Sequence, residues 1–434
     1  MRELLNRFFG LEACGTTIRR EILGGLTNFV AMSYLIVVVP SMLGDAGMSR
    51  EAATAATILA TVGASLLMGL FANLPVAAGP GLGISAYFAY YVCGPAGFSW
   101  QAGLAAVFIS GVVFFLLTVT RLRQSIIEAI PPDLKIATTA GIGCFIALIG
   151  LKNCGLIVAD TAGLTLGDVS EPSVLAAVIG FFFTVTLMIR KVPASIFFGI
   201  VLTAVLGFAC EPTALPQGPL LSLHSADLSQ TFLALDFGQA FSHGLLTIVF
   251  TLTVADLFDN IGSLIGLSRK ADLIDGNGRI KNLDRAFLSD SAATMFSGVV
   301  GTTTVVPYLE SATGIAVGAR TGLSAVVTAL LFAASAFAIP LVSAVPATAT
   351  APALVIVGIL MMQELVVIRF GELRIAVSAF LIILGMPLTF NIATGFGLGF
   401  ISYVVLSFAC GRGRELKPAM ILIALAFAAN FALR

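Results

Sequence analysis

Three acidic residues lie inside apolar stretches of the chain, where charged side chains are costly and rare. Asp256 and Asp259 occur within Val254–Ser263, and Glu310 follows a proline within Gly301–Gly314. The two aspartates are three positions apart, so they share one face if their stretch is helical. We expect no Lys or Arg at the same depth. A carboxyl group without a cation in a low-dielectric interior should hold a proton near neutral pH, which predicts reversible proton binding at all three residues.

Small polar and aromatic residues surround these acids. Thr304, Tyr308 and Ser311 flank Glu310 in the sequence, and Ser85 and Gly83 occur in a second Gly/Pro-rich stretch. Hydroxyl groups and backbone N–H groups at such places can contact a polar ligand, and aromatic rings can stack on a planar one. The hydroxyl residues and the three acids also have a structural interpretation. Ser and Thr commonly join membrane helices through hydrogen bonds, and carboxylates commonly cap helix ends. Aromatic residues near the two stretches, Tyr87, Phe88 and Tyr308, are interpreted mainly as packing residues.

The composition places these residues in a membrane protein. Of the 434 residues, 58% are hydrophobic and 11% are charged, and the mean hydropathy is +1.03. Soluble domains contain about 25% charged residues, so this chain lacks the charge needed to cover a water-exposed surface. The formal net charge is zero, which argues against a nucleic-acid partner. The expected surroundings are a lipid bilayer.

Apolar stretches of roughly 20 residues predict about fourteen membrane-spanning helices. With the N-terminus in the cytoplasm, 21 of the 23 Lys and Arg residues fall on the cytoplasmic side, and only Arg50 and Lys152 fall outside. This asymmetry predicts a cytoplasmic N-terminus, in the inner membrane of a bacterial-type cell. A final apolar stretch, Ala419–Leu433, is short and is expected to be interfacial or partly inserted. The predicted span centres are Ala31, Ala60, Ser85, Ser110, Gly143, Gly180, Leu202, Val254, Ala293, Gly314, Leu331, Val357, Leu381 and Ser402.

The third and tenth predicted spans are interrupted at matching positions of the two halves. Asn73–Ala86 contains Gly-Pro-Gly-Leu-Gly, and Gly301–Gly314 contains Pro307. Pro and Gly weaken helices, so both spans should break into an extended piece followed by a half-helix near the middle of the membrane. Seven spans is an odd number, so a second seven-helix unit would be inverted relative to the first. Paired breaks of this kind are typical of binding sites in transporters built from inverted repeats. The alternative is that the prolines only kink packed helices.

Other classes of membrane protein fit the sequence less well. A membrane hydrolase needs a nucleophile–base pair or a metal motif, but His224 and His243 are the only histidines and the six cysteines are scattered. A channel needs rings of ligands around a continuous pore. A receptor usually carries a soluble domain. An anion carrier should present positive potential at the broken helices, where this chain presents three acids. These features favour a transporter that is not an enzyme and has no cofactor. Its coupling ion, protons, is implied only by a family resemblance.

Several stretches resemble the azaguanine/hypoxanthine/guanine/adenine permeases, a family of purine permeases within the nucleobase:cation symporter-2 (xanthine/uracil permease) superfamily. The resemblance extends from Gly25–Tyr34 to Phe400–Tyr403 and so covers nearly the whole chain. Its most specific stretches are Ala78–Phe88, Trp100–Gly111, Ala140–Gly143, Leu148–Asn153, Asp256–Gly266, Tyr308–Gly314 and Gly318–Gly322.

The resemblance implies an all-α polytopic fold of two inverted seven-helix repeats, with short extended segments in spans 3 and 10. Residues 1–213 would hold the first repeat, residues 236–411 the second, and residues 412–434 a short apolar tail. A core domain would contain spans 1–4 and 8–11, and a gate domain spans 5–7 and 12–14. The superfamily often forms homodimers through the gate domain.

The resemblance also implies proton-coupled uptake of a purine nucleobase. The family acids that hold the base and couple it to protons correspond to Asp259 and Glu310, with Asp256 as a further acid. Two positions depart from the family pattern, because Ser85 and Val39 stand where many members have Asn. Losing an amide that both donates and accepts changes base discrimination. Other cargoes therefore stay open, namely xanthine, uracil or another small planar or anionic solute.

Overall fold

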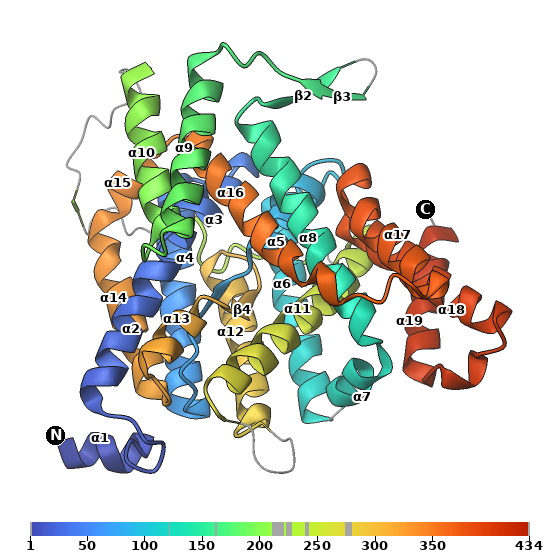
Figure 1. Cartoon of the computed structure of the whole chain (residues 1–434), viewed down its shortest axis with the longest axis horizontal. Helices are drawn as coiled ribbons and strands as arrows, with labels where there is room; N and C mark the ends of the chain where they lie inside the picture. Colours follow the sequence, from blue (N-terminus) through green and yellow to red (C-terminus); the bar gives the residue numbers. More distant parts are fainter. Residues whose placement is uncertain are drawn as a thin grey trace.

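The computed structural model describes residues 2–120, 122–160, 163–210, 221–222, 228–238, 243–273 and 280–432. Residue 213, the predicted end of the first repeat, lies outside these residues, and so does His224. The described chain is almost entirely helical (Figure 1). In the first half the helices are α1 (Arg2–Phe9), α2 (Ile18–Met32), α3 (Leu35–Asp45), α4 (Arg50–Leu66), α5 (Leu82–Tyr87), α6 (Trp100–Val119), α7 (Leu122–Ala129), α8 (Pro132–Asn153), α9 (Pro172–Ile189) and α10 (Ser195–Cys210).

The second half is also almost entirely helical, and it ends in one additional helix at the C-terminus. Its helices are α11 (His243–Lys270), α12 (Leu283–Val300), α13 (Ser311–Val317), α14 (Gly322–Ser335), α15 (Ile339–Ser343), α16 (Ala347–Met362), α17 (Leu373–Thr389), α18 (Ile392–Ala409) and α19 (Pro418–Ala432). Every predicted span centre lies within a helix or a helical turn. Among the described residues, nine helical stretches are long and apolar enough to cross a membrane. The chain is therefore a multi-pass membrane protein.

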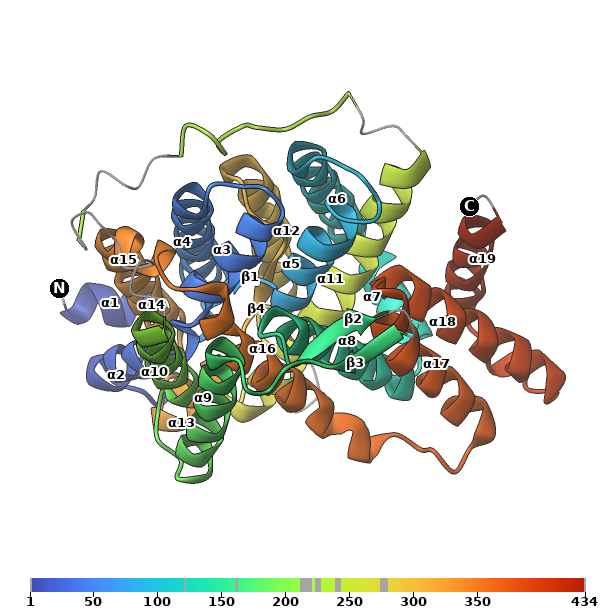
Figure 2. The ribbon, with the colours of Figure 1, turned by 90° about the horizontal axis from the view of Figure 1, so that it is seen from above.

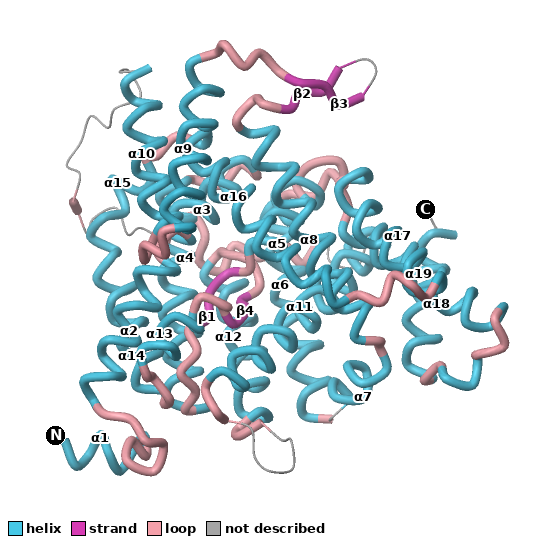
Figure 3. Tube along the Cα trace, in the orientation of Figure 1, coloured by secondary structure: helices cyan, strands magenta, loops and turns pink. Residues whose placement is uncertain are grey.

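Both predicted breaks are present, and they pair with each other. Strand β1 (Ala78–Pro80) runs antiparallel to strand β4 (Val305–Pro307), with Ala78 opposite Pro307 and Pro80 opposite Val305. The two short strands lie at the centre of the molecule (Figure 3). Each strand ends on a proline, which cannot donate to a sheet and is tolerated at a strand end. The half-helices α5 and α13 follow the strands, as the positions of Pro and Gly predicted.

Helix packing is symmetric when the two halves are exchanged. Helix α6 packs on α11 and α12, and its counterpart α14 packs on α2 and α4. The half-helix α13 contacts α2, just as α5 contacts α11, and α8 packs against its own counterpart α16. This pattern, with the antiparallel pairing of β1 and β4, is consistent with two inverted repeats.

The helices form two groups around the paired strands (Figure 2). Helices α3, α4, α6, α11 and α12 fill one side of that view, and α8, α9, α16 and α17 fill the other. Within the second group, α8 and α16 approach so closely that a Cβ atom on Gly143 or on Gly358 would meet the carbonyl oxygen of the other. Small residues at such contacts allow membrane helices to pack backbone against backbone.

Two elements were not predicted in this form. The apolar tail forms α19, which packs on α18 and α7 and inserts Phe427 into an aromatic cluster with Phe250 and Phe400. The Asn430 amide also donates a hydrogen bond to the Thr247 hydroxyl of α11. A hairpin of β2 (Ile157–Asp160) and β3 (Gly163–Leu166) follows α8.

Candidate functional site

The paired strands satisfy the backbone at the breaks, with help from neighbouring hydroxyl groups. The Gly81 N–H donates to the Thr304 carbonyl at 2.9 Å, and the Tyr308 N–H donates to the Ala77 carbonyl at 3.0 Å. The Ser65 hydroxyl lies 3.1 Å from both the N–H and the carbonyl oxygen of Ala78. Extended backbone in a membrane protein persists only where protein or water satisfies its polar groups. This bonding therefore permits an open backbone at mid-span.

Two of the predicted ligand residues hold the strands together. The Ser311 hydroxyl accepts a hydrogen bond from the Ala77 N–H at 3.0 Å. The Tyr308 hydroxyl donates to the Pro80 carbonyl at 2.6 Å. Both side chains thus connect the tenth span to the third. Their described contacts position the break, and a ligand contact by either residue stays a prediction.

The first turn of α5 is joined to the loop that precedes β4. The Ser85 and Thr303 hydroxyl oxygens lie 2.6 Å apart, and both residues are fully buried. Among the described residues, the buried hydroxyls of Thr302 and Thr304 make no hydrogen bond. Thr304, predicted as a ligand residue, therefore has a buried hydroxyl without a partner among the described residues, and its contact with a ligand stays a prediction.

Glu310 and Asp259 are the two predicted acids that keep partial exposure to solvent. Glu310 immediately precedes α13, and its Oε1 atom accepts a hydrogen bond from the Tyr34 hydroxyl at 2.5 Å. Asp259 lies on α11, a helix that packs on both β4 and α13. The Tyr308 hydroxyl interacts electrostatically with both carboxylates. The structure thus brings Glu310, Asp259 and Tyr308 together beside the break.

Asp256 lies one helical turn away from Asp259 and is buried. Its Oδ1 atom accepts a hydrogen bond from the Asn260 amide at 3.0 Å. It also interacts with Asp290 and Arg123. The expectation that no Lys or Arg reaches this depth is wrong: Arg123 Nη2 lies 3.6 Å from Asp290 Oδ2, and both side chains are almost fully buried.

Arg123 reaches this position because aromatic rings enclose its charged end. Its guanidinium lies 3.8 Å from the centre of the Phe114 ring and 3.6 Å from that of Phe287. Arginine has a planar, weakly hydrated charge that stacks well on aromatic rings. The sequence placed Arg123 in a cytoplasmic segment because it follows a predicted span. Asp290 was overlooked although it lies three positions from the predicted span centre Ala293, so a signal for it was present.

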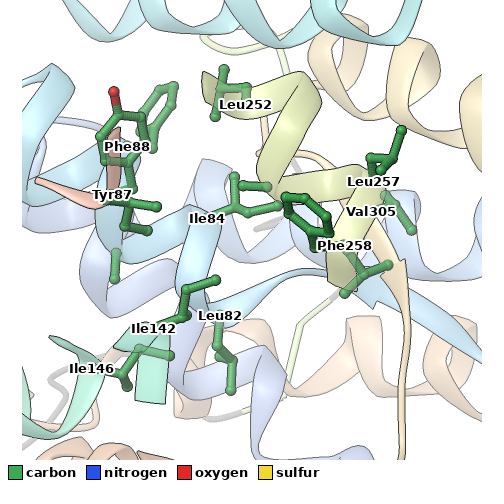
Figure 4. Close-up of a cluster of buried hydrophobic side chains, with 14 of the residues drawn as sticks. Leu82, Ile84, Tyr87, Phe88, Ile142, Ile146, Leu252, Leu257, Phe258 and Val305 are labelled. Carbon is green, nitrogen blue, oxygen red and sulfur yellow. The ribbon is translucent and has the colours of Figure 1, made fainter. Parts of the chain in front are cut away.

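Tyr87, Phe88 and Gly83 of the third span lie in packed surroundings. Tyr87 stacks on Tyr91 with ring centres 5.2 Å apart, and Phe88 is buried. Figure 4 shows Tyr87 and Phe88 among the apolar side chains around α5. A Cβ atom on Gly83 would clash with Ile142 of α8. Packing, the main interpretation of Tyr87 and Phe88 from the sequence, agrees with these positions, and Gly83 provides close helix contact.

Two polar residues of α2 hold the tenth and eleventh spans in place. The Glu21 carboxylate is fully buried and accepts hydrogen bonds from the N–H groups of Arg320 at 2.7 Å and Ser324 at 3.1 Å, at the start of α14. The Asn28 side-chain oxygen accepts from the Gly314 N–H at 2.9 Å. One N–H group of the half-helix α13 is therefore bound within the protein, where the sequence analysis expected such groups to face a ligand.

Comparison with known proteins places this site in a family. Residues 19–398 match the Xan_ur_permease family, described as a permease family. A guanine/hypoxanthine permease of Bacillus subtilis, PbuO, is 40% identical over 96% of this chain and 98% of its own length. An adenine permease of Escherichia coli, AdeQ, is 40% identical over 98% of this chain and 95% of its own length.

Solved structures support the same architecture. The transmembrane domain of a cyanobacterial bicarbonate transporter, BicA, superposes with a TM-score of 0.63 over 89% of this chain and 97% of that domain, at 14% identity. SLC26A9 superposes with a TM-score of 0.65 over 90% of this chain and 66% of that one, at 11% identity. At such low identity these similarities show the fold alone. The chain belongs to the Xan_ur_permease family, and it is a membrane transporter, not an enzyme.

Proposed function

We propose that the protein imports a purine nucleobase (guanine, hypoxanthine or adenine) together with protons across the inner membrane. The observation that carries this proposal is the pair of partly exposed carboxylates, Glu310 and Asp259, beside two paired breaks in the membrane. Relatives about 40% identical over almost the whole chain are named guanine/hypoxanthine and adenine permeases. The same residues can hold a base and bind a proton.

The chemistry of the site suits the edge of a purine ring. A carboxylate accepts two parallel hydrogen bonds, which match adjacent ring and exocyclic N–H groups such as those of guanine. We assign this role to Glu310, with Asp259 as the second acid. The Thr304 hydroxyl, with no hydrogen bond among the described residues, would contact the remaining ring or carbonyl groups, and Ser85 would contribute through its hydroxyl pair with Thr303.

A difference between two pairs of acids supports the proposed proton coupling. Asp256 and Asp290 share the buried cation Arg123. Among the described residues, no ion pair to a cation is found for Glu310 or Asp259. An acid that is partly exposed and lacks a cation partner can exchange protons with solvent as the site opens. We therefore assign proton loading to Glu310 and Asp259. Asp256 is a further coupling acid on the family resemblance alone.

Transport would occur by alternating access, with the core domain (spans 1–4 and 8–11) moving against the gate domain (spans 5–7 and 12–14). The helices on the two sides of Figure 2 support this division, since α3, α4, α6, α11 and α12 belong to the proposed core and α8, α9, α16 and α17 to the proposed gate. The proposal of a cytoplasmic N-terminus rests on the distribution of Lys and Arg. By analogy with the superfamily, we also propose a homodimer that forms through the gate domain.

A second candidate is a carrier of the same fold for xanthine, uracil or another small planar or anionic solute. Ser85 is engaged with Thr303, and Val39 is completely buried next to Pro40. Neither offers the amide found at these positions in many family members. The identity of the base is therefore the part of the proposal that a transport experiment must decide.

The test is uptake of labelled guanine, hypoxanthine, adenine, xanthine and uracil by cells that lack their own nucleobase carriers. It is run with and without a protonophore, and alongside Glu310→Gln and Asp259→Asn. We expect protonophore-sensitive uptake of a purine, reduced at least tenfold in both variants at equal surface expression. Uptake of xanthine or uracil alone would favour the second candidate, and uptake of no base by well-expressed protein would refute the nucleobase assignment.

A further inference from the structure

Tyr34 lies at a joint in the first span. Helix α2 ends at Met32 and α3 begins at Leu35. The Tyr34 carbonyl accepts hydrogen bonds from the N–H groups of Val37 at 3.1 Å and Val38 at 3.0 Å. The side chain is 1% exposed. The bonds to the start of α3 hold the backbone of Tyr34 in place, and burial confines its phenol.

The phenol points at the acid that we assign to base recognition. Its hydroxyl donates to Glu310 Oε1 at 2.5 Å, a distance at the short end of the range for a hydroxyl bound to a carboxylate. This contact joins residues 276 positions apart and connects the first span with the tenth. Tyr34 also interacts electrostatically with Tyr308, the residue that holds the two strands together.

We propose that Tyr34 is a positioning residue for substrate recognition. This inference rests on the proposed function, because it concerns how Glu310 meets the N–H edge of a nucleobase. A free glutamate side chain rotates about three bonds, but a carboxylate held at Oε1 presents its remaining acceptor positions in one direction. The phenol thereby sets the plane in which a flat heterocycle with adjacent N–H donors must bind.

The first experiment replaces the phenol and keeps the ring. In Tyr34→Phe, we expect KM for the transported purine to rise about tenfold, as expected for loss of a hydrogen bond to a charged group. The maximal rate per expressed molecule should stay within about twofold of wild type. Once the purine is bound, a Glu310 carboxylate without the Tyr34 hydrogen bond can still bind the proton and take part in the conformational change. An unchanged KM, or a fall in maximal rate alone, would overturn the inference.

The matched control is Tyr403→Phe, which makes the same chemical change elsewhere. Tyr403 is buried in α18, where its ring lies 5.5 Å from the Arg374 guanidinium. This variant should leave KM unchanged. A rise in KM equal to that of Tyr34→Phe would show a general effect of losing a buried phenol and would also overturn the inference.

A second measurement does not depend on purine transport. A hydrophobic carbodiimide modifies membrane-buried carboxyl groups, and mass spectrometry reads the modification of the peptide that contains Glu310. Releasing Glu310 from the phenol should make it react several-fold faster in Tyr34→Phe than in wild type, with Glu310→Gln as the unreactive reference. Equal rates would overturn the positioning role. If wild type transports no purine, the proposed function fails, and this measurement still decides whether Tyr34 holds Glu310.

Discussion

At the scale of single residues, the interior contains one described arginine where none was expected. Arg123 brings a positive charge to Asp290, and its guanidinium lies between Phe114 and Phe287. Asp256 adds a second carboxylate to the same environment. A buried charge that loses its partner is strongly destabilising, whereas removing both partners costs much less. The Arg123–Asp290 pair should therefore contribute to stability, and this contribution can be measured without a transport assay.

We expect Arg123→Met to lower the free energy of unfolding by about 3 kcal/mol, because Asp290 is left buried without a cation. The combined variant Arg123→Met with Asp290→Asn should recover part of this loss, because Asp290 no longer carries a buried charge while Asp256 still lies without its cation. The stability of each variant is measured by heating a fluorescent fusion in detergent. Size-exclusion chromatography then gives the fraction that is still folded at each temperature. Equal destabilisation in the single and combined variants would show that Arg123 contributes by packing rather than by charge.

At the scale of elements, the critical unit is the pair of strands of three residues each. So short a pairing forms few backbone hydrogen bonds, so side chains must complete it. Ser65 of α4 does so twice, through the N–H and the carbonyl oxygen of Ala78. The position of α5, and with it Ser85, depends on this strand.

We expect Ser65→Ala to lower stability by about 1–3 kcal/mol, because it leaves buried backbone groups of Ala78 without a partner. Purine uptake should fall as well, because strand β1 loses its hydrogen bonds to the Ser65 hydroxyl and no longer positions α5. Ser110→Ala is the matched control, because within the described part of the chain the Ser110 hydroxyl bonds only the Val107 carbonyl of its own helix, at 2.8 Å. Melting temperature and uptake are measured for both variants. A Ser65→Ala protein as stable as the control would contradict this role.

The sequence predicted these elements better than it predicted their contacts. Proline and glycine act locally, so the breaks at Pro80 and Pro307 could be located from the sequence, and apolar length located the spans. The contact between Tyr34 and Glu310 could not be found in this way, because it joins residues far apart in the chain. Arg123 was missed for a related reason: its burial depends on Phe114 and Phe287, which only the fold brings to it.

At the scale of the whole molecule, hydrogen bonds cross between the proposed core and gate domains on the predicted external side. The Asn153 amide of α8 donates to the Tyr90 hydroxyl at 2.8 Å, and Tyr90 donates to Asp45 at 2.7 Å. The Arg50 guanidinium donates to the Val345 carbonyl at 3.3 Å. If the core moves against the gate, the Asn153–Tyr90 and Arg50–Val345 bonds must break whenever the site opens outward, whereas the Tyr90–Asp45 bond lies within the core.

Cys93, three positions after Tyr90, reports on this opening. Cys93 caps the end of the third span and is half-buried. Opening of the outer side should expose it further to water, where a thiol more readily forms the reactive thiolate. We expect Tyr90→Phe to increase labelling of Cys93 by a membrane-impermeant maleimide several-fold, in a background without the other five cysteines. Raising the pH should increase labelling in both proteins, and equal rates at every pH would contradict the closure role.

The pairing of β1 with β4 also has a consequence for how the protein is made. Pro80 and Val305 lie opposite each other but are 225 positions apart in the chain. At about 5–20 residues per second, a ribosome needs roughly 10–45 s to synthesise the intervening segment. During that time the first break is in the bilayer without the strand that completes its hydrogen bonds. Biogenesis must therefore shelter this segment, by water, by lipid headgroups or by an insertion factor, until the second half arrives.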